Sequence, residues 1–338
     1  MTMVEGTGSE GRARRRYGGR CATRLGRKLF SIMIPHRGWV APGMPHVGLI
    51  EATSRDGVAV RGWTHRPPGC DRGTVLILHG LLRNCTMDDI PAWAGRFARV
   101  HRLAAAAIDL RFHGRSGDRV PSFAYAEAWD AGAALDELDR LGFPRPYVLM
   151  GGSLGALTAQ RLALTDDRVA GAALIAMPGW PWHGVRTGAS AIAGLAEQEA
   201  RARLPPLAAI PLGIGLRVLG RFGRLVARLV NASYGRDVLV AGDVRGMPMP
   251  AHRPKILSVI GDRDTFDWRA TRLAWQAWYR DRGPRPNRWP HEAPDQEAWF
   301  VLVPGRIHPP GPMDILHWEG LPVLIDRFLE RVLVARAG

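Results

Sequence analysis

Short apolar runs alternate with longer amphipathic stretches along the chain from residue 47 onward. The apolar runs are bounded by turn residues and predict buried strands at 74–79, 104–109, 147–150, 169–177, 254–260 and 298–303. Helical spacing of apolar residues predicts helices near 87–100, 124–141, 154–165, 266–281 and 313–335. This alternation predicts an α/β fold with a mainly parallel central sheet and helices on both faces.

Two further strands precede this series and form a different unit. Residues 47–54 and 58–65 alternate between apolar and polar positions and are joined through Arg55, Asp56 and Gly57. Because Asp-Gly between alternating runs is a strong turn signal, the segment is predicted to form a β-hairpin.

Residues 178–250 lie between two predicted strands and break the alternation of strands and helices. This segment is much longer than the few residues that usually connect a strand to a helix. Residues 188–204 and 214–230 have helical apolar spacing and are separated by a proline-marked segment. The sequence therefore predicts one α/β core made of 47–177 and 251–338, with 178–250 as a helical lid inserted over the strand ends. Residues 1–46 are predicted to be a basic, largely disordered arm.

Charge is concentrated in two regions of this +15 chain. Residues 1–37 carry nine Lys or Arg against two Glu, and residues 180–245 carry nine Arg against four acids. Only two of the 46 basic residues are lysines and no aromatic-interleaved motif accompanies them, so nucleic-acid binding is not expected. Contact of the Arg-rich lid with an anionic membrane or an acyl carrier stays an open alternative to a merely solvated face.

Three scattered cysteines, Cys21, Cys70 and Cys85, form neither a disulfide framework nor a metal-ligand pattern. No cofactor or metal is predicted. The N-terminal region has no signal-peptide pattern, and the sequence shows no apolar stretch long enough to span a bilayer. We therefore expect a cytoplasmic protein; its oligomeric state is not indicated.

A serine flanked by glycines lies between the strand predicted at 147–150 and the helix predicted at 154–165. The motif is Gly151-Gly152-Ser153-Leu154-Gly155, which contains Gly-x-Ser-x-Gly in a strand–turn–helix context. This is the setting of a nucleophile elbow, in which a strained turn presents the serine and the glycines allow close approach of neighbouring backbone. Ser153 is predicted to be a nucleophile rather than an incidental turn residue.

A serine nucleophile needs a base and a group that orients the base. His308 follows the last predicted strand and is favoured over His291 and His317, which lie in a proline-rich loop and in the predicted final helix. In the chain order serine, acid, histidine, the acid is Asp262 or Asp264, directly after the strand at 254–260. Asp264 is preferred, because Asp262 is well placed to cap the turn.

Backbone donors for a developing oxyanion are predicted at two positions. The strand at 74–79 ends in His79-Gly80, which lets the N–H of Leu81 face the site, and the second donor is the N–H of Leu154. His79 could serve as a base, but it fits a structural role in the turn better.

The segments TVLILHGLLRN, AIDLRFHGRSG, VLMGGSLGALTAQRLAL, SVIGDRDTF and VPGRIHP occur in the order of the α/β-hydrolase superfamily. Over residues 47 to 336 the chain resembles its lid-bearing serine hydrolases of the serine-aminopeptidase and lysophospholipase type. The resemblance implies that Ser153, Asp264 and His308 form a catalytic triad. The chain departs from the family at Phe112, where the family usually has glycine, and in its long stretch between the acid and the histidine.

These observations predict a serine hydrolase that cleaves a carboxylic ester of a hydrophobic small molecule or lipid-like substrate. A thioesterase or acyltransferase of a biosynthetic pathway is the alternative, because the same machinery serves those reactions. A non-catalytic binding protein is disfavoured, since such proteins usually lack one of the three residues.

Overall fold

The computed structural model describes residues 43–87, 89–187, 223–234, 237–248, 250–264, 266, 268–276, 287–288, 298–308 and 315–334. Within these residues nine strands form one sheet in the order β1-β2-β4-β3-β5-β6-β7-β9-β8. The strands are β1 (Val47–Thr53), β2 (Ala59–His65), β3 (Thr74–Leu78), β4 (Ala104–Asp109), β5 (Tyr147–Gly152), β6 (Val169–Ile175), β7 (Lys255–Gly261), β8 (Asn287–Arg288) and β9 (Ala298–Val303).

The pairs β1–β2 and β2–β4 are antiparallel, and the remaining pairs are parallel. β1 pairs with β2 through the register Thr53↔Ala59, which is the predicted hairpin, and β2 pairs antiparallel with β4. From β4 to β8 every neighbouring pair is parallel. The prediction of a mainly parallel α/β sheet is confirmed, and most predicted strands agree with the observed ones to within two residues.

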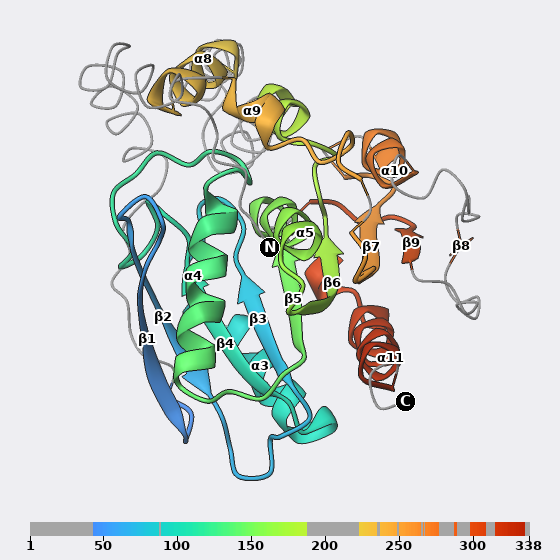
Figure 1. Cartoon of the computed structure of the whole chain (residues 1–338). Coiled ribbons are helices and arrows are strands. Elements are labelled where there is room, and N and C mark those ends of the chain that lie inside the picture. Colours follow the sequence, from blue (N-terminus) through green and yellow to red (C-terminus); the bar gives the residue numbers. More distant parts are fainter. Residues whose placement is uncertain are drawn as a thin grey trace, which may run out of the picture.

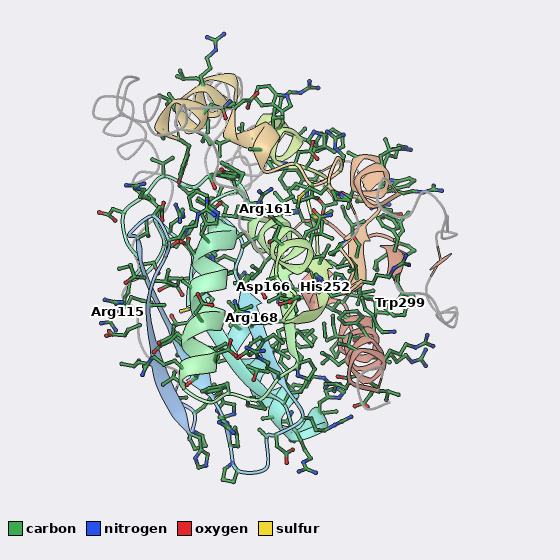
Figure 2. The ribbon with its side chains drawn as sticks, in the orientation of Figure 1. Arg115, Arg161, Asp166, Arg168, His252 and Trp299 are labelled. Carbon is green, nitrogen blue, oxygen red and sulfur yellow. The ribbon has the colours of Figure 1, made fainter. Side chains whose placement is uncertain are left out.

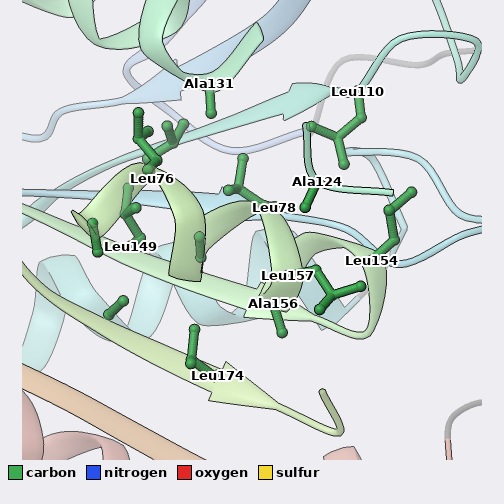
Figure 3. Close-up of a cluster of buried hydrophobic side chains, with 14 of the residues drawn as sticks. Leu76, Leu78, Leu110, Ala124, Ala131, Leu149, Leu154, Ala156, Leu157 and Leu174 are labelled. Carbon is green, nitrogen blue, oxygen red and sulfur yellow. The ribbon is translucent and has the colours of Figure 1, made fainter. Parts of the chain in front are cut away.

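Helices cover both faces of the sheet (Figure 1). On one face α4 (Glu127–Arg140) packs over β1 and β2 and α5 (Leu154–Thr165) packs over β3, β5 and β6; on the other lie α3 (Asp89–His101) and α11 (Gly320–Val334). β3 shows why both faces are apolar: Leu76 and Leu78 join the core under α4 and α5, whereas Val75 and Ile77 join the core under α3 and α11. Figure 3 shows the first of these cores, with Leu76 and Leu78 opposite α4 and α5.

The C-terminal third differs most from the predicted elements. The helix predicted at 313–335 is a 3-10 turn, η2 (Ile315–His317), followed by α11, and the helix predicted at 266–281 is described as α10 (Trp268–Gln276). The two-residue strand β8 was not predicted, because it is too short to produce an alternating pattern.

The described part of the 178–250 insertion contains a helical turn at 181–187 and the helices α8 (Gly223–Tyr234) and α9 (Val238–Ala241). Figure 1 shows α8 and α9 beyond the carboxyl ends of the parallel strands, over α4 and α5. Three contacts tie them to the core. Tyr234 Oη donates to the Val120 carbonyl, Arg111 Nη1 donates to Tyr234 Oη (3.4 Å), and Arg161 of α5 donates to the Ala241 carbonyl (2.6 Å; Figure 2).

Helix α8 is amphipathic. Ala227, Leu229 and Val230 are buried and Val226 packs against the core, whereas Leu225 and Arg228 are exposed. The described part of the helix predicted at 214–230 therefore buries one apolar face, and Leu225 lies outside it. The helix predicted at 188–204, residues 214–222 and the N-terminal arm up to residue 42 lie outside the described residues.

Candidate active site

Ser153 lies at the sharp turn between β5 and α5. Its backbone has φ 51° and ψ −110°, an unfavourable conformation for a residue with a side chain. The turn is held by Ser153 N–H, which donates to the Ile175 carbonyl at the end of β6 (2.9 Å). Strain of this kind persists only where the surrounding structure enforces it. Here the strained turn places Ser153 at the carboxyl end of β5.

Two of the three neighbouring glycines are required by space. A Cβ on Gly151 would lie 2.2 Å from the Gly155 carbonyl oxygen, and a Cβ on Gly155 would lie 2.1 Å from the Leu78 carbonyl oxygen of β3. Gly152 is different, because a Cβ there would meet no atom within 4 Å. The close-approach explanation therefore holds for the outer glycines of Gly-x-Ser-x-Gly and not for Gly152.

The structure brings Ser153, His308 and Asp264 together from three separate loops. His308 Nε2 lies 3.0 Å from Ser153 Oγ, and His308 Nδ1 lies 3.1 Å and 3.2 Å from the two carboxylate oxygens of Asp264. With the imidazole proton on Nδ1, that nitrogen donates to Asp264 and Nε2 accepts the hydroxyl proton of Ser153. The Asp264 side chain is fully buried, so water does not compete for this carboxylate.

Asp262 has a different position from Asp264. Its carboxylate accepts the Gly305 N–H (2.7 Å), and its own N–H donates to the Val303 carbonyl (3.0 Å). Arg263 N–H similarly donates to the Arg306 carbonyl (3.1 Å). These bonds join the loop after β7 to the loop after β9, and so set the distance between Asp264 and His308.

Leu81 and Leu154, the predicted oxyanion donors, both adjoin the serine. Leu154 is the first residue of α5, where a backbone N–H has no acceptor within its own helix. Leu81 follows Gly80, and a Cβ on Gly80 would lie 3.4 Å from Ser153 Cβ. The turn around Leu81 is closed by Arg83 N–H, which donates to the Gly80 carbonyl (3.3 Å), while the Arg83 side chain pairs with Asp89 at the start of α3.

His79 is a structural residue. Its Nε2 accepts the Leu110 N–H (3.0 Å), which leaves Nδ1 to donate to the Gly80 carbonyl (2.8 Å). Burial lowers the pKa of His79 to about 4, so the ring is neutral at physiological pH. Both ring nitrogens are engaged in fixing the turn, which leaves none free to act as a base.

Phe112 keeps the loop shape that glycine would favour. Its φ is 68°, in the left-handed region, and its side chain is buried. The adjoining Arg111 is fully buried and forms ion pairs with Asp130 of α4 (2.6 Å) and Asp56 of the hairpin turn (2.9 Å). Although burial alone would lower it, the pKa of the Arg111 guanidinium is raised by the Asp130 carboxylate. Sequence patterns gave no sign of this network, because its members lie far apart along the chain.

Of the other histidine candidates, His317 lies in η2, and His291 lies outside the described residues. Among the residues that the structure describes, no group of three or more His, Cys, Asp or Glu side chains could hold a metal ion. Within the same part of the chain, no helix has both the length and the apolar character needed to cross a bilayer.

Comparison with known proteins agrees with this architecture. The family model described as the α/β-hydrolase fold matches residues 73–206. An esterase from Pyrococcus furiosus superposes with a TM-score of 0.59 at 18% identity, covering 90% of this chain and 98% of its own. The α/β hydrolase GrgF from Penicillium superposes with a TM-score of 0.56 at 16% identity, covering 87% of this chain and 100% of its own.

A third similar structure is Est1E from Butyrivibrio proteoclasticus with bound ferulic acid, at a TM-score of 0.54 and 15% identity, covering 84% of this chain and 99% of its own. A search of curated proteins finds no match. Strand order, the strained serine turn and these likenesses agree: the chain has the α/β-hydrolase fold.

Proposed function

We propose that this protein is a serine hydrolase that cleaves carboxylic esters through an acyl-enzyme intermediate. The observation that carries the proposal is the hydrogen-bonded series Ser153 Oγ, His308 Nε2, His308 Nδ1 and Asp264, set on a strained elbow. A serine without a base is a weak nucleophile, whereas a serine 3.0 Å from an oriented imidazole can lose its proton as it attacks. The same geometry argues against a purely binding role.

The reaction follows from these positions. Ser153 Oγ attacks the ester carbonyl carbon while His308 Nε2 takes the hydroxyl proton, and Asp264 stabilises the resulting imidazolium. The N–H groups of Leu81 and Leu154 donate hydrogen bonds to the carbonyl oxygen and stabilise the negative charge that develops on it. His308 then returns the proton to the leaving alcohol, and the acyl group stays on Ser153 until water, activated by the same imidazole, releases it as a carboxylic acid.

The proposed substrate is a hydrophobic small molecule or lipid-like ester. Apolar residues adjoin the serine and the histidine: Leu154 follows Ser153 in the chain, and Phe266 packs against His308. Leu81 and Leu82 follow Gly80 in the neighbouring turn. Such surroundings favour an apolar acyl or alcohol group and exclude water from the developing charge. Attack by an acceptor other than water would give acyl transfer, and the first half of the reaction would be unchanged.

The test is turnover of p-nitrophenyl butyrate by the wild-type chain and by Ser153→Ala. Replacement of a triad serine lowers kcat by about 10⁴-fold or more, and a normal circular-dichroism spectrum would show that the variant is folded. Near-normal turnover by Ser153→Ala would contradict the proposed mechanism.

A further inference from the structure

Phe266 contacts both members of the acid–histidine pair. Its ring packs against the His308 imidazole in a T-shaped arrangement, with centroids 4.6 Å apart and planes at 74°. Its backbone N–H donates to Asp264 Oδ1 (2.8 Å). The side chain is 7% exposed, so the ring is held in the core and not free to move away from the imidazole.

The two contacts restrain different motions. The N–H donates to Asp264 Oδ1, the oxygen that lies 3.1 Å from His308 Nδ1, and this bond helps to keep the carboxylate aimed at that nitrogen. The hydrogen bonds at Nδ1 and Nε2 lie in the imidazole plane, so they restrain the ring weakly against tilting out of that plane. A second ring packed at 74° to the imidazole blocks that tilt.

We infer that Phe266 is a positioning residue of the proposed reaction: its ring sets the orientation of His308 and its backbone sets that of Asp264. The inference rests on the proposed function. During attack His308 Nε2 takes the proton of Ser153 Oγ, and the orientation of the imidazole matters most at that step. The ring therefore acts mainly in the transition state, and its loss should lower kcat while leaving KM almost unchanged.

The experiment compares Phe266→Leu, Phe266→Tyr and the control Phe97→Leu. Leucine removes the ring but keeps an apolar side chain and the backbone N–H, whereas tyrosine keeps the ring. Phe97 is a fully buried phenylalanine of α3, in the core under α3 and α11, and controls for the general effect of losing a buried ring.

We expect Phe266→Leu to lower kcat by about threefold to thirtyfold with KM within about twofold of wild type. Phe266→Tyr should recover kcat to within about threefold, and Phe97→Leu should keep the wild-type kcat. A wild-type kcat in Phe266→Leu, or an equal loss in Phe266→Tyr or in Phe97→Leu, would overturn the inference.

A second measurement tests whether Phe266 acts through His308. The rate of fluorophosphonate labelling is compared in His308→Ala with and without Phe266→Leu. Since no imidazole is left to position, the second substitution should have no further effect; a further slowing would show that the ring acts elsewhere and would refute the inference. Ser153→Ala in the same series separates the two proposals, because its activity reports on the proposed function whatever Phe266 does.

Discussion

Gly155→Ala is expected to disable the site, because the new Cβ would clash with backbone atoms at the end of β3. The new Cβ would lie 2.1 Å from the Leu78 carbonyl oxygen and 2.7 Å from that of His79, whereas such contacts need at least 3.0 Å. Both obstacles are backbone atoms of β3 and its end, so no side chain can rotate out of the way. Relief requires α5 to move from β3 by about 1 Å.

Ser153 directly precedes the first residue of α5, so its hydroxyl moves with the helix. A displacement of about 1 Å takes Ser153 Oγ out of hydrogen-bond reach of His308 Nε2, which is now 3.0 Å away, and misplacement of this size costs about 10²-fold in rate. Overpacking of this kind also lowers the free energy of unfolding by about 1–3 kcal/mol.

The matched control is Gly152→Ala, because a Cβ at Gly152 meets no atom within 4 Å. We expect Gly152→Ala to keep kcat within about threefold of wild type. The assay is kcat with p-nitrophenyl butyrate, together with thermal unfolding followed by circular dichroism. Wild-type kcat in Gly155→Ala, or an equal loss in both variants, would show that close approach of β3 does not govern the elbow.

Three further predictions concern the acid, the pH dependence and the substrate. Asp264→Asn should lower kcat by about 10⁴-fold by favouring the wrong histidine tautomer, while Asp262→Asn keeps an oxygen for its backbone donor and should lose less than about tenfold; equal losses would refute the assignment. Although burial opposes it, Arg96 and His101 hold the pKa of Asp326 below its ordinary value of 3.8, so stability present above that value is lost as pH falls below it. Urea unfolding from pH 6 to 3 should show this slope, and Asp326→Asn should flatten it. Finally, kcat/KM should rise from acetyl to octanoyl p-nitrophenyl esters, since each buried methylene contributes about 0.8 kcal/mol; a sharp preference for acetyl would contradict a hydrophobic site.

The sequence predicts the parallel part of the sheet well because its central strands are buried on both faces and are therefore continuous apolar runs. The run at 104–109, for example, coincides with β4, and α5 begins and ends where its apolar spacing does. The serine was identifiable from its local motif, since strand, glycine turn and helix are adjacent in the chain.

Contacts between distant segments could not be predicted in the same way. The ring of Phe266 meets His308 across 42 positions of the chain, and no periodicity encodes that pairing. Arg111 lies beside Phe112, but its partners come from the hairpin turn, from α4 and from α8. The two aspartates after β7 could be ranked by turn geometry, but only the fold places Asp264 rather than Asp262 at the imidazole.

The central claim is that Ser153 is a nucleophile activated by His308. The most direct test is labelling of the intact protein with a fluorophosphonate, followed by peptide mass spectrometry. A single adduct on Ser153, lost in Ser153→Ala and slowed by orders of magnitude in His308→Ala, is the expected result. An adduct on another residue, or labelling of Ser153 at an unchanged rate without His308, would contradict it.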